Sequence, residues 1–172
     1  MIFAETERLR LRALRREDLP RYAELIGDWD VARWLSPVPY PYFMKHAEEF
    51  FAKMDALYRA GTPELFLITD KTSDAVMGAI GLHPVKSLDA QETTHAEIGY
   101  WLGKPFWGRG IMTEAVRAVL ALGFQRSELC RITAVTDPAN YASQKVLSKA
   151  GLRFLGTESC VKTARRNTET LI

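Results

Sequence analysis

Residues 107–114 read Trp-Gly-Arg-Gly-Ile-Met-Thr-Glu and lie between a predicted strand and a predicted helix. Glycine has no Cβ, so Gly108 and Gly110 let backbone amides approach a ligand closely. The helix that follows adds unpaired N–H groups and roughly half a positive charge at its N-terminus. These features predict an anion site suited to a phosphate or diphosphate, with Arg109 as a further charged donor. The alternative is a glycine-rich turn in which Thr113 caps the helix.

Two known nucleotide motifs fit this stretch poorly. The P-loop pattern GxxxxGK[ST] is absent, and a dinucleotide fingerprint needs a third glycine where the sequence has Thr113. Glu128 lies 20 residues after Gly108, the spacing of a ribose-binding acid. However, only 64 residues follow Gly108, too few for the two halves of a dinucleotide-binding domain.

The elements around this stretch follow from hydrophobic periodicity. A strand is predicted over Thr93–Leu102, with Ala96, Ile98 and Tyr100 on one face and Glu97, Gly99 and Trp101 on the other. Apolar residues at spacings of three and four predict a helix over Ile111–Phe124. The remaining predictions toward the C-terminus are a strand at Cys130–Thr136, a helix at Ala139–Ala150 ended by Gly151, a strand at Leu152–Val161 and a short strand at Thr168–Ile172.

The N-terminal half predicts one strand, then helices, then a hairpin. Arg8–Leu14 alternates, so Arg8, Arg10 and Arg12 share one face, either a basic patch or a solvated strand face. The further predictions are a helix that starts at Glu17–Pro20, a loop at Trp29–Tyr42 with a short helical piece near Val31–Leu35, a helix over Met44–Ala60, and a hairpin of Glu64–Thr69 with Ala75–Leu82. This order predicts an α/β (α+β) fold, a mixed, mostly antiparallel central sheet flanked by helices.

Composition sets the broad class. The chain has 172 residues, 47% of them hydrophobic, and 23 Lys+Arg against 21 Asp+Glu leave a net charge of +2. That mixture predicts a single globular domain over residues 1–172 and argues against disorder and against a nucleic-acid-coating protein. No apolar run approaches the ~20 residues of a membrane helix, and we expect no signal peptide, no membrane and a cytoplasmic location.

Two cysteines, Cys130 and Cys160, lack the spacing of a zinc site or a disulfide framework. We expect them to be small buried apolar side chains, and we expect no metal.

A second segment with chemical potential is residues 137–152. Asn140 and Ser143 stand one turn apart at the predicted start of a helix. Both side chains are able to hydrogen-bond an extended, amide-bearing ligand. The alternative is that they cap the helix, which suits Asn140 better than both residues together.

Read together, these segments resemble the GNAT acetyltransferase superfamily, and more closely its branch that acetylates N-terminal amines of ribosomal proteins (Rim-type). The branch's Trp-Gly-Lys-Gly-Tyr-Ala-Thr-Glu-Ala loop is matched by residues 107–115, and its Asn-x-x-Ser-x-x-x-Leu-x-Lys-x-Gly-Phe signature by residues 140–152. Residues 96–102 and 5–12 also fit, so the resemblance covers nearly the whole chain. Met112 departs from the small residue of the family loop, and Leu147 stands where many members carry a tyrosine proposed as general acid.

The resemblance implies a GNAT acyl-CoA N-acyltransferase fold, acetyl-CoA as cosubstrate and direct attack by a primary amine in a ternary complex. In the family a backbone N–H of the strand near Tyr100, Trp101 and Leu102 holds the thioester oxygen. The implied catalytic residues are Glu97, as the base that takes the amine's proton directly or through water, and Ser143, as a proton donor or a pantetheine contact. The implied cofactor-binding residues are Tyr100, Trp101, Leu102, Trp107, Gly108, Arg109, Gly110, Ile111, Met112, Thr113, Asn140 and Ser143.

The expected acceptor is the N-terminal amine of a protein, ribosomal proteins included, or a small amine or antibiotic. Members of this branch often dimerise, so a homodimer is one expected state. Two other function classes stay open at this stage. One is a non-catalytic acyl-CoA-binding module on the same fold. The other is a nucleotide- or RNA-binding protein, which the balanced charge and the missing P-loop disfavour.

Overall fold

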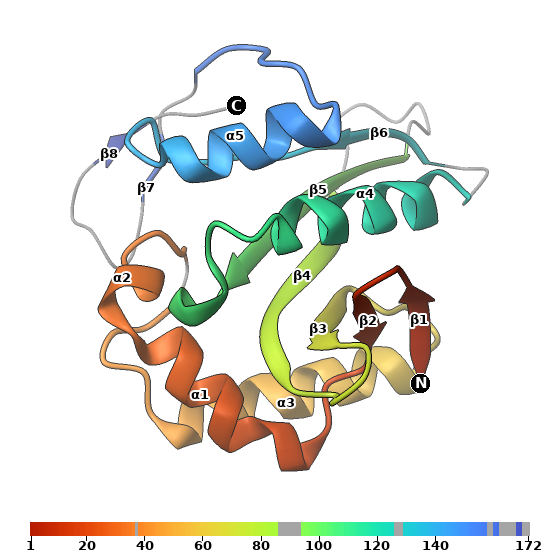
Figure 1. The fold of residues 1–172 in the computed structure, drawn as a ribbon, viewed down its shortest axis with the longest axis vertical. Helices are drawn as coiled ribbons and strands as arrows, with labels where there is room; N and C mark the ends of the chain where they lie inside the picture. Colours follow the sequence, from red (N-terminus) through yellow and green to blue (C-terminus); the bar gives the residue numbers. More distant parts are fainter. Residues whose placement is uncertain (37, 86–93, 126–128, 158–159, 162–167, 170–172) are drawn as a thin grey trace.

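A single curved sheet of six strands carries the fold of the computed structural model, and its strands lie in sequence order (Figure 1). The structure describes residues 1–36, 38–85, 94–125, 129–157, 160–161 and 168–169. Neighbouring strands are antiparallel except the last pair, which is parallel. The strands are β1 (Ile2–Glu5), β2 (Leu9–Arg12), β3 (Leu65–Asp70), β4 (Val76–Val85), β5 (Thr94–Leu102) and β6 (Leu129–Thr133). This mixed, mostly antiparallel sheet with flanking helices confirms the expected fold class.

The helices begin and end where the sequence carries helix signals. Pro20 lies in the first turn of the first helix, and Gly61 and Gly151 adopt positive φ just after two of the others. The α-helices are α1 (Leu19–Gly27), α2 (Trp29–Ala32), α3 (Met44–Arg59), α4 (Ile111–Phe124) and α5 (Tyr141–Ala150), with 3-10 turns η1 (Arg16–Asp18) and η2 (Lys104–Phe106). Within the described residues, none of these helices is long and apolar enough to cross a bilayer.

The sheet separates two hydrophobic layers. Helix α4 packs on one face, while α1 and α3 cover the other (Figure 1). Strands β3 and β4 are buried on both faces along most of their length, which explains their nearly continuous apolar sequences. The strands between these layers are covered on both sides, so successive side chains of β5 face opposite layers. Ile98 packs in the α4 layer and Trp101 in the α1 layer.

Several predicted elements have different bounds. Strand β1 was not predicted, because its four residues are largely exposed and give little alternation. The predicted strand Cys130–Thr136 is shorter, since β6 ends at Thr133. The prediction of a strand over Leu152–Val161 is wrong for residues 152–157, which have no regular structure, and only β7 (Cys160–Val161) pairs, with β8 (Thr168–Glu169). The helical piece predicted near Val31–Leu35 begins earlier, as α2.

Two side chains also contradict the sequence predictions. Arg12 was expected on a solvated face or in a basic patch, yet it is 1% exposed and forms a bidentate pair with Asp18. Burial opposes its charge, but hydrogen bonds to Asp18 and Asp74 outweigh that effect and raise the pKa of the guanidinium. Cys130, expected to be buried, is exposed because β6 is the last strand of the six-stranded sheet. The side chain of Cys160 lies outside the described residues.

Candidate active site

The site begins where two parallel strands separate. Strands β5 and β6 pair from Thr94 with Leu129 to Glu97 with Thr133, and their pairing stops there. Strand β5 nevertheless continues to Leu102, which still pairs with Gly78 of β4. Backbone groups on the β6 side of Ile98–Leu102 therefore have no strand partner, and they face a cavity instead.

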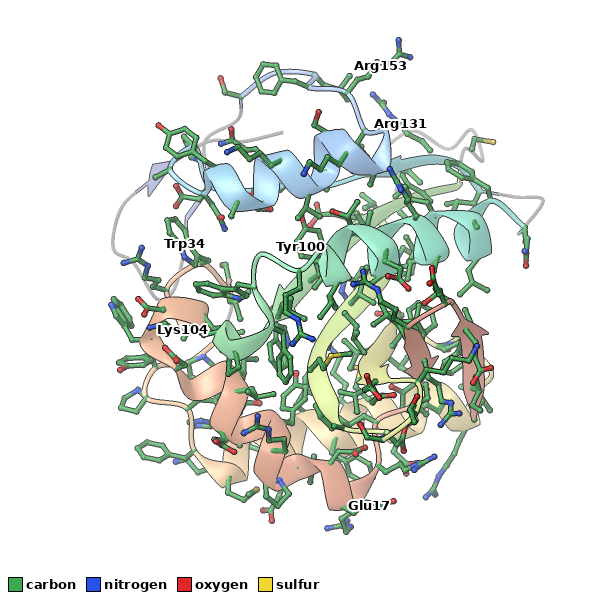
Figure 2. The ribbon with its side chains drawn as sticks, in the orientation of Figure 1. Glu17, Trp34, Tyr100, Lys104, Arg131 and Arg153 are labelled. Carbon is green, nitrogen blue, oxygen red and sulfur yellow. The ribbon has the colours of Figure 1, made fainter. Side chains whose placement is uncertain are left out.

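This cavity has a volume of about 580 Å³. It is lined by the end of β5, the loop before α4 and the first turns of α5, together with the segment around α2. Trp34 and Tyr100, labelled in Figure 2, lie 66 positions apart in the sequence and both line it. Its size falls in the range of small-molecule sites, and its position between diverging strands suits an extended ligand.

The predicted anion loop has the backbone conformation that its glycines suggest. Gly108 and Gly110 both have φ of 73°, the left-handed region that favours glycine. Gly110 is the N-cap of α4, and the first helical hydrogen bond runs from Glu114 N–H to the Gly110 carbonyl at 3.1 Å. The amides of Ile111, Met112 and Thr113 thus precede that first bond and stand at the positive end of the helix dipole. The alternative role of Thr113 as the cap is wrong, because it lies within the helix.

A hydrogen-bond network from the β1–β2 turn holds this loop. Arg8 donates from Nε to Glu114 Oε2 at 2.7 Å and from Nη1 to the Arg109 carbonyl at 3.0 Å. Thr6 donates to the other Glu114 oxygen. Burial alone would raise the pKa of Glu114, but the hydrogen bonds from Thr6 and Arg8 outweigh it and lower that pKa. The network fixes the loop from a segment about 100 residues away, and the prediction of the site did not include Arg8.

The other end of the loop is tied to β5. Trp107 Nε1–H donates to the Leu102 carbonyl at 2.7 Å, so the indole bonds the carbonyl of the last residue of β5. Trp107 is 43% exposed and lines the cavity.

Helix α5 closes the opposite wall. Asn140 is its N-cap, and its Oδ1 accepts from the Ser143 amide at 3.1 Å, so the capping interpretation of Asn140 is confirmed. Ser143 Oγ lies 2.9 Å from the Tyr100 hydroxyl, which also donates to the Ser143 carbonyl at 3.3 Å. Burial raises the pKa of Tyr100 to about 12, although the Ser143 hydrogen bond opposes this. The neutral pair joins β5 to α5 across the cavity.

Among the predicted site residues, Glu97 lies outside the cavity that the others line. The structure brings Tyr100, Trp101 and Leu102, the whole 107–113 loop, Asn140 and Ser143 around the one cavity. Glu97 instead stands at the point where β5 and β6 part, half buried and outside the cavity lining. Its side chain shares the face of Gly99 and Trp101. Glu128, the acid of the dinucleotide alternative, lies outside the described residues.

Sequence reasoning missed two features of the site. These are the guanidinium of Arg8 and the contact of the Tyr100 hydroxyl with Ser143. The Glu-Thr-Glu-Arg opening at residues 5–8 was the available signal for Arg8, since it fits the family pattern without belonging to the loop. No periodic signal connects Tyr100 to Ser143, because they meet only in the fold. Within the described residues, no three His, Cys, Asp or Glu side chains gather as a metal site would require.

Comparison with known proteins places the chain in a family. The model of the acetyltransferase (GNAT) domain matches residues 8–153. The chain belongs to the GNAT acetyltransferase family. The expected class of enzyme, an acetyl-CoA-dependent N-acetyltransferase, is thereby confirmed.

A curated relative and two solved structures illustrate the likeness. An uncharacterized N-acetyltransferase, p20 of Bacillus licheniformis, is 33% identical over 151 residues, which cover 88% of this chain and 82% of the relative. A GNAT-family acetyltransferase from Bacillus anthracis has the same fold, with a TM-score of 0.83, 23% identity, and coverage of 99% of this chain and 95% of that one. RimL, a ribosomal L7/L12 α-N-protein acetyltransferase solved with coenzyme A, gives a TM-score of 0.78 at 18% identity, with 99% of this chain and 95% of that one covered.

Gly110→Ala is expected to weaken coenzyme A binding by about tenfold or more, because the new Cβ would stand among the amides that approach the diphosphate. Among the described residues other than its chain neighbours, the Arg8 guanidinium is the group within 4 Å of that Cβ position, at 3.7 Å, so the surrounding side chains are not crowded. Gly61→Ala is the matched control, since Gly61 has the same φ of 73° outside the cavity. Calorimetric titration and thermal melts check this. A Gly110→Ala variant that keeps its affinity within about twofold would contradict it.

Arg8→Ala is expected to lower the affinity for coenzyme A about threefold or more, because the Arg109 carbonyl and the Glu114 carboxylate lose their shared donor. Arg10→Ala is the control, since Arg10 lies two residues farther along, on β2, and pairs with Glu5 and Asp74 rather than with the loop. Equal losses in the two variants would show that Arg8 acts through general charge and not through the loop.

Proposed function

We propose that this protein transfers the acetyl group of acetyl-CoA to a primary amine, with the N-terminal amine of a protein as the acceptor. The observation that carries the proposal is the cavity between β5 and β6, with an amide-rich helix start at one end and unpaired strand backbone along its side. Such a cavity matches a long ligand with a diphosphate at one end and a reactive thioester at the other. The name of the RimL neighbour supports a ribosomal protein as the acceptor.

The loop residues bind the donor in this proposal. The amides of Gly108, Gly110 and the first turn of α4 receive the diphosphate, and Arg109 adds a charged donor. The pantetheine arm then hydrogen-bonds the free edge of β5 between Ile98 and Leu102 as an added strand would. This arrangement directs the thioester toward the point where the two strands part.

The acyl transfer follows by direct attack. The thioester oxygen becomes an oxyanion, which a backbone N–H in the Tyr100–Leu102 region stabilises, a type of contact worth about 3–4 kcal/mol in other enzymes. The amine must lose a proton before it attacks, and Glu97, the base that the family resemblance implies, lies at the point where the two strands part. A free thiol has a reference pKa near ~8.5, so the thiolate leaves with little assistance. Ser143 then serves mainly to hold the pantetheine arm.

The acceptor enters beside α2. Arg33 follows α2 and lines the cavity, and its Nε is buried without a hydrogen-bond partner in the described part of the chain. A buried N–H without a partner is costly, and a peptide carbonyl would satisfy it. This orphan donor favours a peptide over a simple amine as the acceptor.

The test of the function is turnover on a panel of acceptors. Peptides that begin with Ser, Ala and Met, together with spermidine, are incubated with acetyl-CoA, and released thiol and product mass are measured. We expect a peptide to be acetylated with the highest kcat/KM, and no stable acetylated enzyme in the absence of acceptor. Tight coenzyme A binding with no turnover on any amine would instead support a non-catalytic binding module. Preference for spermidine would support a small-amine acceptor.

Glu97→Gln is expected to lower kcat at neutral pH about tenfold or more while coenzyme A affinity stays within about twofold, because the carboxylate acts on the amine and not on the donor. Initial rates at saturating acetyl-CoA and a binding titration check this. An unchanged rate from acid to alkaline pH would remove Glu97 from the mechanism.

Tyr100→Phe is expected to raise the KM for acetyl-CoA about threefold or more with kcat within about twofold, because the lost hydroxyl no longer holds the start of α5 against β5. Ser143→Ala should behave in the same way. A fall in kcat at constant KM would assign the Tyr100–Ser143 pair to protonation of the leaving thiolate.

A further inference from the structure

The imidazole of His83 lies over two glycines on neighbouring strands. Gly81 and Gly99 are cross-strand partners on β4 and β5, and His83 is two residues from Gly81, so all three share one face of the sheet. A Cβ at Gly81 would lie 2.5 Å from His83 Nε2, and one at Gly99 would lie 4.0 Å from it. The ring therefore fills the space that a side chain at Gly81 would take.

Glu64 holds the other nitrogen of the ring. His83 Nδ1 lies 3.3 Å from Glu64 Oε2, and the Glu64 carbonyl accepts from the Leu82 amide at 2.9 Å, which fixes the glutamate beside β4. Because an ionised carboxylate only accepts hydrogen bonds, we expect the neutral ring to carry its proton on Nδ1 and a lone pair on Nε2.

His83 Nε2 lies near Gly99, which lines the cavity, while His83 itself stands outside the lining. Gly99 is one of the cavity's lining residues, and it is the residue nearest the parting of β5 and β6 on this face. Glu97 is the direct cross-strand partner of His83, so the two side chains leave the same face of the sheet from neighbouring positions. Of the two, His83 leans toward Gly99 and the cavity.

We infer that His83 is the group that takes the proton from the attacking amine, with Glu64 as its positioning residue and Glu97 as the anion that keeps the ammonium beside it. The inference rests on the proposed function and deepens it. Imidazole is a side chain suited to proton transfer near neutral pH. Nothing in the loop or in α5 supplies another base, since Ser143 and Tyr100 are paired with each other.

The proton balance is complete with these groups. One ammonium proton passes to His83 Nε2, and the neutral nitrogen forms a bond with the thioester carbon. The C–S bond then breaks, and the thiolate receives the second amine proton as the amide forms. His83, whose side chain is 47% exposed, returns its proton to solvent. The net products are the acetylated amine, coenzyme A thiol and one proton.

Kinetics against pH tests this role. In the described part of the chain, the titratable groups that face His83 are Glu64 from the segment before β3, and Glu97 and His95 from β5. With the best peptide of the panel, His83→Asn is expected to lower kcat/KM about 100-fold near pH 7 and less than about fivefold near pH 9.5, where the amine is already largely neutral. Coenzyme A affinity should stay within about twofold.

Matched variants separate a base from a structural residue. Added imidazole is expected to restore activity to His83→Ala, because the free base enters the vacated space over Gly81 and Gly99. Glu64→Gln should cost about tenfold in kcat and leave the KM for acetyl-CoA unchanged. Glu97→Gln should lower the rate but keep the pH dependence that His83→Asn removes. His95→Gln is the control with no expected effect, since His95 lies farther from the cavity and bonds Thr133.

A second readout does not depend on turnover. The chain has three histidines, so nitrogen-15 correlation spectra of the rings are assignable with His46→Gln, His83→Asn and His95→Gln. Neutral His83 should carry its proton on Nδ1, and Glu64→Gln should shift that preference. A proton found on Nε2 would overturn the inference. So would an active wild type whose His83→Asn variant keeps its kcat/KM, whereas a wild type that acetylates no amine overturns the proposed function itself.

Discussion

The end of the pairing between β5 and β6 at Glu97 and Thr133 governs the rest of this molecule. Beyond this point β5 is held only from its β4 side, so a row of backbone donors and acceptors is left facing a cavity. In most sheets such an edge is covered or invites aggregation. Here the loop before α4 and the start of α5 enclose it, which reserves the edge for an extended ligand. Every proposed contact with the acetyl donor depends on that separation.

Two ties keep the separated elements in place. Arg8 and Thr6 fasten the loop through Glu114, and Tyr100 joins β5 to Ser143 at the start of α5. Each hydrogen bond of this kind contributes only about 1–3 kcal/mol to stability. The value of the two ties is geometric, because they fix two ligand-facing walls that no strand pairing holds. The buried Arg12–Asp18 pair fixes the chain in a similar way at the end of β2, where it anchors the segment that leads into α1.

The face of the sheet opposite α4 has a different character. There the cross-strand glycines Gly81 and Gly99 leave room for the His83 ring, and Glu64 and Glu97 flank it. Acetyl-CoA bound along the backbone edge and an amine bound on this face would meet at the point where the strands part. In the proposed mechanism the glycines at positions 108 and 110 let the diphosphate approach, and those at 81 and 99 leave room for the His83 ring.

The sequence was most informative where a local rule decides the conformation. The glycines of the loop, the helix ended by Gly151 and the alternation of β5 all predicted what the structure has, because φ preferences and the two-residue period of a strand act within a few residues. It misjudged Arg12 and Cys130, whose environments depend on what packs over a strand or on its position at the sheet's edge. Strand β1 and the bounds of β6 were missed for a related reason, since pairing is a property of two strands.

By itself, then, the sequence predicted the fold class, most of the elements, the conformation of the glycine-rich loop and, through three linked motifs, the family. Only the tertiary structure decided where β5 and β6 part, that Arg8 reaches the loop, that Tyr100 meets Ser143, and that His83 lies over Gly99 between two glutamates. The physical reason is that these contacts join residues between about 15 and 100 positions apart. Their distance in space is set by sheet register and helix packing, and no single stretch of the chain contains that information.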